Sequence, residues 1–224
     1  MLQFLWVIFP YLMITIFLVG HIYRYNFDQL SWTAKSSEFL EKKSLRWGSM
    51  LFHIGILFVF AGHVFGLLIP KTVLSAVGIG ETLYHTGAVY GGGFAGIVTL
   101  IGIIILFSRR LTNKRVRMTS DSSDIITVVF IFLIILIGTY NTLIGNQFHP
   151  HFDYRETISP WFRGLLTFTP DPFLMRDVPI GFQLHILISF ALIGIWPFTR
   201  LVHVWSVPLT YFKRRYIIYR KRAG

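Results

Sequence analysis

Histidine is the residue type in this 224-residue chain whose positions point most directly to chemistry. Four of the eight histidines lie in or at the ends of two long apolar runs, His53 and His63 in the run at about 47–69 and His185 and His203 in the run at about 181–205. Neutral imidazole binds metal ions, and it also exchanges protons near neutral pH. Such a polar side chain costs free energy in hydrocarbon unless it is used there. We therefore expect these four histidines to hold a cofactor.

The elements that must position them are membrane spans. A bilayer-spanning helix needs about 20 consecutive apolar residues. Runs of this kind predict spans at about 2–23, 47–69, 83–107, 125–144 and 181–205, and only 14% of the residues are charged. The N-terminal run has no basic n-region and no small-residue cleavage site, so we expect a retained span. The sequence predicts an all-α integral membrane protein, a five-helix transmembrane bundle forming a single domain over 1–224.

The distribution of basic residues predicts the orientation of this bundle. With five spans, 17 of the 21 Lys and Arg residues fall on one side and 4 on the other. Positive charge favours the cytoplasmic side, which puts the N-terminus outside and the C-terminus in the cytoplasm. Because the charge of +11 is concentrated beside the spans, it fits membrane lipid or an acidic partner surface, and it argues against nucleic acid. The absence of cysteine places any iron–sulfur cluster in a partner chain.

This topology pairs the four histidines. The second and fifth spans run in opposite directions, so as neighbours they set His53 opposite His203 near the cytoplasm and His63 opposite His185 near the outer face. A haem iron takes two axial ligands, and two such pairs would serve two bis-histidine haems. A single intramembrane histidine is more often a hydrogen-bonded packing residue, but four at matched depths argue against that alternative. The spacing is unequal, because ten helical residues rise ~15 Å and eighteen rise ~27 Å.

Other residues are expected to support this site. Gly55, Gly62 and Gly66 are expected to leave room for a flat cofactor, whereas the glycines at 91–93 and 96 fit either a cofactor or close helix packing. His85, beside Tyr84, is a candidate for proton exchange with a quinol at the depth of the outer pair.

On the opposite side, Arg110 and Arg200 are expected either to pair with haem propionates or to extend to the interface. Asp124 is expected to cap the fourth span. His149 and His151 lie in the loop 145–180, where nothing in the sequence completes a metal site.

The chain resembles the gamma subunit of respiratory nitrate reductases, a membrane cytochrome b, from end to end. The resemblance rests on RYNFDQLSWTAKSSEFLEKK (24–43), LFHIGIL and GHVFG (51–66), GGGFAG (91–96), the basic residues at 109–117, LH (184–185) and PFTRLVHVWSVP (197–208). It implies two haem b groups, with His53 and His203 as iron ligands of the inner one and His63 and His185 of the outer one. It also implies a quinol site beside the outer haem, with candidates Gly62, His63, Gly66, Tyr84 and His85. Well-studied members have a basic residue where this chain has Tyr84 and His85.

The resemblance further implies a function in anaerobic respiration at the bacterial inner membrane. A quinol, commonly menaquinol in this family, would be oxidised near the outer face. Electrons would pass through the outer and inner haems to a cytoplasmic iron–sulfur beta subunit, and a molybdenum alpha subunit would reduce nitrate. Two alternatives stay open: a haem b anchor of another cytoplasmic reductase, sulfite- or heterodisulfide-linked, and a five-span transporter or assembly protein without haem.

Overall fold

The computed structural model describes residues 1–28, 40–149 and 151–205, and within these ranges it contains helices and no strands. Five of the helical segments in the described ranges are long and apolar enough to cross a membrane: Phe4–Phe27, Lys43–Leu68, Glu81–Thr112, Ser122–Gly145 and Ile180–Phe198. The predicted all-helical class and the five spans are confirmed.

Each of the five spanning segments combines α-helix with a short π- or 3₁₀-helical stretch. They consist of η1 (Phe4–Ile8) with α1 (Phe9–Phe27), α2 (Lys43–His63) with η2 (Val64–Leu68), α4 (Glu81–Thr86) with η3 (Gly87–Gly92) and α5 (Gly93–Thr112), α7 (Ser122–Tyr140) with η4 (Asn141–Gly145), and α10 (Ile180–Ile195) with η6 (Trp196–Phe198). Shorter elements connect them: α3 (Lys71–Ala76), α6 (Lys114–Met118), α8 (Asn146–Phe148), α9 (Ile158–Leu166), η5 (Pro172–Met175) and η7 (Arg200–Val204).

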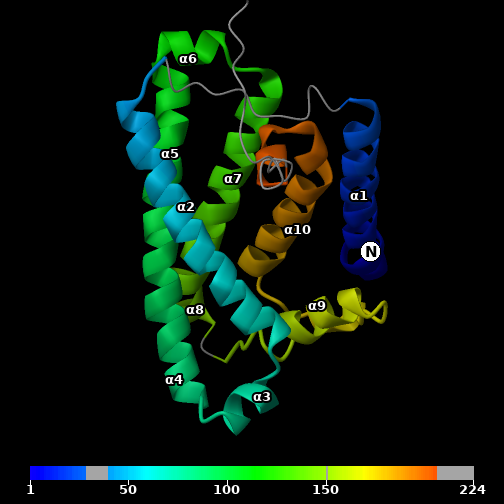
Figure 1. The fold of residues 1–224 in the computed structure, drawn as a ribbon. Coiled ribbons are helices and arrows are strands. Elements are labelled where there is room, and N and C mark those ends of the chain that lie inside the picture. Colours follow the sequence, from blue (N-terminus) through cyan, green and yellow to red (C-terminus); the bar gives the residue numbers. More distant parts are fainter. Residues whose placement is uncertain (29–39, 150, 206–224) are drawn as a thin grey trace, which may run out of the picture.

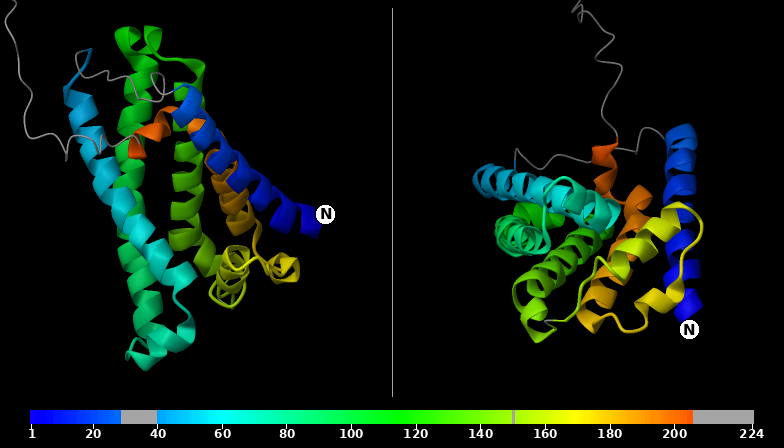
Figure 2. Two further views of the ribbon diagram at one scale, coloured as in Figure 1. Left: turned by 45° about the vertical axis from the view of Figure 1, so that its right-hand side comes forward. Right: turned by 90° about the horizontal axis from the view of Figure 1, so that it is seen from below.

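The spans pack side by side in a fixed order. Helix α2 packs against α5, α5 against α7, α7 against α10, and α10 against α1, as Figures 1 and 2 show. Glycines permit the closest of these contacts: a Cβ on Gly102 would lie 2.7 Å from the Cα of Phe52, and one on Gly55 would lie 2.8 Å from the backbone nitrogen of Thr99. Gly55 therefore serves contact between α2 and α5, and the expectation that it makes room for a cofactor is wrong.

The glycines at 91–96 differ in what lies next to them. A Cβ on Gly91 would meet nothing within 4 Å, whereas one on Gly96 would lie 2.9 Å from Oγ1 of Thr139 in α7. Gly93 likewise faces Leu143. Of the two expected uses, the structure supports close helix packing for Gly93 and Gly96.

The two ends of the bundle are built differently. Helices α3, α4 and α9 lie at one end and α6 at the other (Figure 1). Helix α9 lies across the spans at the first end, where Trp161 and Met175 pack with Trp6 in a buried apolar cluster. We refer to the two ends as the α9 end and the α6 end.

Two local expectations change. The N-cap of α7 is Asp121, and Asp124 instead lies in the first helical turn, where its carboxylate pairs with Arg110 at 2.8 Å. The fifth span was predicted to run to residue 205, but α10 ends at Ile195. Pro197, which has no backbone N–H to donate, and the extended backbone of Thr199 end it, and a 3₁₀ turn follows.

Candidate functional site

The structure brings the four intramembrane histidines together as two pairs. The imidazole centroids of His53 and His203 lie 6.4 Å apart with their planes at 68°, and those of His63 and His185 lie 6.1 Å apart at 21°. His53, His63 and His203 are exposed, and His185 is partly exposed. The pair of His63 and His185 is nearer the α9 end, and the pair of His53 and His203 is nearer the α6 end.

Hydrogen bonds fix the tautomer of all four rings. Each Nδ1 lies within 3.0 Å of a backbone carbonyl oxygen, that of Ser49 for His53, Val59 for His63, Ile134 for His185 and Arg200 for His203. A carbonyl oxygen only accepts, so Nδ1 carries the proton and donates it. The lone pair is then on Nε2, which is the arrangement that metal-binding histidines show.

The distance between paired rings suits one metal ion with a ligand on each side. With each nitrogen about 2 Å from the metal, the ring centres lie roughly 6.5 Å apart. Among the described residues there is no cluster of three or more His, Asp or Glu side chains that would hold an ion. The two imidazoles of each pair supply two ligands, so each pair would fit a metal that arrives with its remaining ligands, as haem iron does. Helices α2 and α10 are not among the closely packed helix pairs, so a flat group between them need not displace a packed interface.

The way α10 ends explains how two histidines eighteen residues apart can lie opposite two that are ten residues apart. Because the chain folds into η6 and η7 after Ile195, the eighteen residues from His185 to His203 do not rise as one helix. The indole Nε1 of Trp196 donates to the carbonyl oxygen of Leu201 at 2.9 Å and holds this fold. His203 is thereby kept opposite His53.

Gly138 is a site residue that the sequence analysis missed. A Cβ at this position of α7 would lie 2.8 Å from Cε1 of His185. Its helix also supplies the Ile134 carbonyl that accepts from His185. A glycine in an Ile-rich run, IFLIILIGTY, was the signal available in the sequence.

At the α6 end, arginines and carboxylates are paired. Asp124 bridges Arg110 at 2.8 Å and Arg200 at 3.6 Å, and buried Arg109 pairs with Glu41 at 2.7 Å. The backbone N–H of Ser44 donates to the Glu41 carboxylate and, with the hydrogen bond from Arg109, lowers the pKa of Glu41. Arg110 and Arg200 are thus held by Asp124, a partner that the sequence analysis did not assign to them.

The residues expected around a quinol are brought together only in part. A Cβ on Gly62 would meet nothing within 4 Å, and the neighbouring His63 side chain is exposed. A Cβ on Gly66 would lie 2.8 Å from the hydroxyls of both Tyr84 and Tyr154, and these two hydroxyls are 2.5 Å apart. His85 is exposed on α4. Tyr154, from the loop before α9, was not identified from the sequence.

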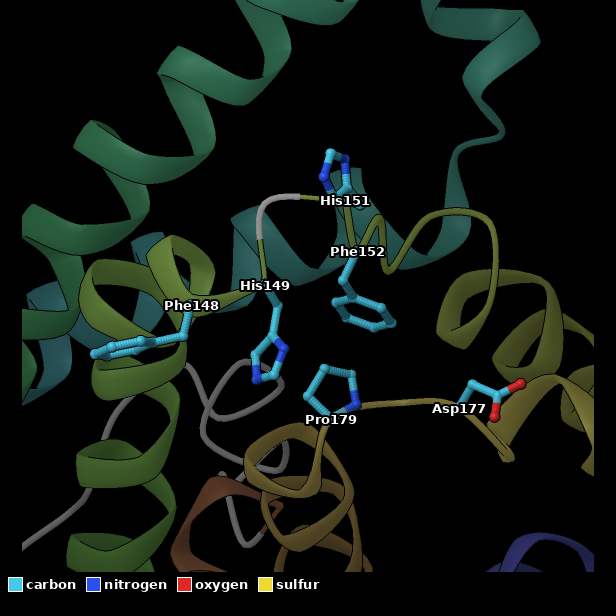
Figure 3. Close-up of a pocket in the computed structure, with 6 residues that line it drawn as sticks. All are labelled: Phe148, His149, His151, Phe152, Asp177 and Pro179. Carbon is cyan, nitrogen blue, oxygen red and sulfur yellow. The ribbon is translucent and has the colours of Figure 1, made fainter.

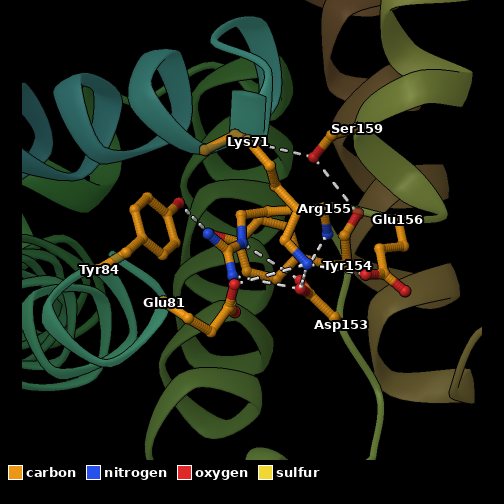
Figure 4. A network of polar contacts seen from close by, with 9 residues as sticks. Lys71, Glu81, Tyr84, Asp153, Tyr154, Arg155, Glu156 and Ser159 are labelled. Atoms are coloured by element: carbon orange, nitrogen blue, oxygen red, sulfur yellow. Dashed lines mark hydrogen bonds and ion pairs between the residues drawn. The ribbon is translucent and has the colours of Figure 1, made fainter. Parts of the chain in front are cut away.

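A charged network surrounds the two tyrosines (Figure 4). The guanidinium of Arg155 lies 4.0 Å from the ring centroid of Tyr84 and pairs with Glu81 and Asp153. Lys71 contacts Asp153 at 2.6 Å, Glu156 at 2.8 Å and Glu81 at 3.6 Å. This network ties the start of α3 and the start of α4 to the loop 153–156.

The network shifts the pKa values of its members. Burial raises the pKa of Asp153, but hydrogen bonds from Lys71 and Arg155 outweigh it, and the net pKa is lowered. Hydrogen bonds to Asp153 and Glu156 raise the pKa of Lys71. Burial and the hydrogen bond with Tyr84 raise the pKa of Tyr154, so the Tyr154 hydroxyl is neutral at neutral pH.

We expect acid to loosen this loop. Because the pKa of Asp153 is lowered, its ionised carboxylate contributes fully to the stability of the loop above about pH 4. This stabilisation is lost as the pH falls through the pKa of Asp153 in the folded state. The pKa of Lys71 is raised instead, so the stabilisation that its ammonium group gives is lost only at high pH and is present throughout this acid range. Hydrogen–deuterium exchange of the 151–157 amides, corrected for intrinsic rates, should increase between pH 6 and pH 3. Asp153→Asn should exchange faster at pH 6 and respond less to acid, whereas Asp171→Asn, whose carboxylate bonds locally to the Phe173 N–H, should behave as the parent chain. An equal acid response in the parent chain and Asp153→Asn would contradict this prediction.

The loop histidines line a separate cavity of about 380 Å³ with Phe148, Phe152, Asp177 and Pro179 (Figure 3). The imidazoles of His149 and His151 point in opposite directions from the loop. This arrangement does not direct both rings at one metal ion.

Fold and site together define a multi-span helical membrane protein with paired intramembrane imidazoles. A family model described as nitrate reductase gamma subunit matches residues 2–222. The chain belongs to this family of membrane anchors of respiratory nitrate reductase, and it is a multi-pass protein of the bacterial inner membrane.

Individual relatives agree with this assignment. The chain is 51% identical to the nitrate reductase gamma chain of Bacillus subtilis over 99% of both chains. It is 38% identical to the respiratory nitrate reductase 2 gamma chain of Escherichia coli, over 98% of this chain and 96% of that one. It is also 41% identical to the nitrate reductase-like protein NarX of Mycobacterium tuberculosis, of which it spans 34%.

Proposed function

We propose that this chain is the dihaem b, quinol-oxidising subunit of a respiratory nitrate reductase complex. A quinol is oxidised near the outer face, and electrons pass by the outer and then the inner haem to a cytoplasmic iron–sulfur subunit and a molybdenum subunit that reduces nitrate. The observation that carries this proposal is the pair of facing imidazole couples, all four with Nδ1 bonded to a carbonyl. In this proposal His53 and His203 hold the inner haem, and His63 and His185 hold the outer one.

The proposed orientation puts the α9 end outside. By the five-span topology of the sequence, the loops of that end hold 4 of the 21 basic residues, Lys71, Arg155, Arg163 and Arg176. Two of them are neutralised within the network, because Lys71 and Arg155 contact its carboxylates. The positive charge of the α6 end favours the cytoplasm and an acidic partner surface. The basic segment 213–222, a further candidate for that contact, lies outside the described residues.

We place the quinol beside His63, where Gly62 leaves open space. The hydroxyls of Tyr84 and Tyr154, both facing Gly66, can donate to or accept from a quinol oxygen. His85 is the candidate for taking up a released proton, because imidazole titrates near neutrality. Menaquinol is the expected donor.

At the other end, Arg110 and Arg200 are the candidates for binding propionates in competition with Asp124.

The nitrate reductase relatives favour this complex over the sulfite- and heterodisulfide-linked alternatives. The iron–sulfur beta subunit and the catalytic alpha subunit are accordingly the proposed partners. The absence of cysteine fits this division of labour, because thiolate-bound clusters must then lie in another chain.

A redox titration of membranes containing the complex tests the proposal. We expect two haem b components in the reduced-minus-oxidised absorption spectrum, one of which shifts when a quinol-site inhibitor is added. A spectrum without a haem b signal would support the transporter or assembly alternative instead. A single component, or two that both ignore the inhibitor, would contradict the proposed dihaem or quinol assignment respectively.

A further inference from the structure

The end of the second span leaves backbone carbonyls without partners from its own helix. After His63, α2 passes into the π-helix η2, which ends where Ile69 becomes extended. The last four carbonyl groups of a helix lack intrahelical donors, and Pro70, the next residue, has no N–H to offer. Unpaired carbonyl groups are costly where water is scarce. Those of Gly66 and Leu67, within four residues of His63, are therefore in need of external donors.

Helix α9 supplies these donors. Ser159, whose residue is 0% exposed, donates its hydroxyl to the carbonyl oxygen of Gly66 at 2.8 Å. Arg163, one turn further along the same helix, donates from its guanidinium to the carbonyl oxygen of Leu67 at 2.9 Å. Its positive charge also interacts favourably with the negative end of the helix dipole.

The other face of α9 is fixed to the first span. The indole Nε1 of Trp161 donates to the carbonyl oxygen of Trp6 at 2.8 Å, and the two indole rings meet edge to face with centroids 5.7 Å apart. The hydroxyl of Tyr11 donates to the carbonyl oxygen of Leu165 at 3.0 Å. Helix α9 is therefore anchored independently of α2 and presents Ser159 and Arg163 from a fixed position.

We infer that Ser159 and Arg163 are positioning residues for the outer haem. They hold the π-helical end of the second span, and through it they hold the imidazole of His63 at its distance and near-parallel angle to His185. Among the described helices, none comparable to α9 packs against the His53 end of α2, so the inner pair does not depend on Ser159 and Arg163. This inference rests on the proposed function, since it assigns a role toward the outer haem.

The test uses the whole complex in membranes and compares Ser159→Ala, Arg163→Gln and Ser159→Thr with the parent chain. Redox titration and low-temperature haem spectra are the measurements. Changing partners that orient a metal-binding histidine weakens metal binding roughly 10- to 100-fold. We expect Ser159→Ala and Arg163→Gln to lower the content of the inhibitor-sensitive haem, or to shift its potential and spectrum, while the other haem stays unchanged. Ser159→Thr keeps the hydroxyl donor and should restore the parent behaviour.

Thr167→Ala is the matched control, because the exposed hydroxyl of Thr167 bonds locally to residues 163, 164 and 169 around the end of α9. Unchanged haem components in both Ser159→Ala and Arg163→Gln would overturn the inference. Equal loss of both haems from a chain still inserted in the membrane would overturn it too, since α9 would then support the bundle as a whole. A parent chain without two haem components would instead refute the proposed function, so the two failures are distinguishable.

Discussion

Replacing His63 or His185 by alanine should abolish quinol-dependent nitrate reduction while part of the haem remains. Each substitution removes one ligand of the proposed outer haem, and changes to the partners of such a ligand alone cost roughly 10- to 100-fold in metal binding. We therefore expect a fall in quinol-dependent activity of more than about 100-fold. Redox titration of the membranes should show that the inhibitor-sensitive component is lost and that the other component persists.

His149→Ala is a suitable control for the outer pair, because its imidazole lines the separate cavity in the loop before α9. It should retain both components and full activity. If His63→Ala or His185→Ala instead removed only the inhibitor-insensitive component, the assignment of the two pairs to the two sides would be inverted.

Substituting His53 or His203 should separate quinol oxidation from nitrate reduction. These imidazoles belong to the pair nearer the α6 end, through which electrons would leave for the iron–sulfur subunit. We expect His53→Ala and His203→Ala to lose the inhibitor-insensitive haem and to lower quinol-dependent nitrate reduction by more than about 100-fold. Rapid-mixing absorption measurements should still record reduction of the remaining haem by quinol, but not its reoxidation by nitrate.

An artificial donor that reduces the soluble subunits directly provides the control for this experiment. With such a donor, nitrate reduction by the His53→Ala complex should match that of the parent complex. Normal reoxidation of the remaining haem by nitrate in His53→Ala would show that the inner pair is not on the path.

Sequence reasoning was most successful where one strong physical constraint acts. Long apolar runs admit few structures in a bilayer, and the five spans follow from them. The pairing of His53 with His203 and of His63 with His185 followed from antiparallel direction alone, and the structure places these rings together. Their role as haem ligands stays a proposal.

What the sequence did not reveal depends on contacts between distant segments. Gly55 lies in the same span as the two histidines, yet only the packing of α2 on α5 shows that Thr99 faces it. Tyr154 is one of several polar residues in a long loop until the fold sets its hydroxyl beside that of Tyr84. Asp124 matched the pattern of an N-cap, but its carboxylate pairs with two arginines from other segments.

The break after α10 has a consequence for chain length. Because α10 ends at Ile195, before His203 is reached, α2 is the one described α-helix that carries two of the four paired histidines, and its ten residues from His53 to His63 rise ~15 Å. One extra residue between them would swing His63 by about 100° around the helix axis and out of reach of His185. The segment between Ile195 and Arg200 is held differently, by the hydrogen bond from Trp196 to Leu201 and by the buried side chain of Pro197. The length of α2 between His53 and His63 therefore sets the depth difference between the two imidazole pairs, and the fold after α10 brings His203 to the level of His53.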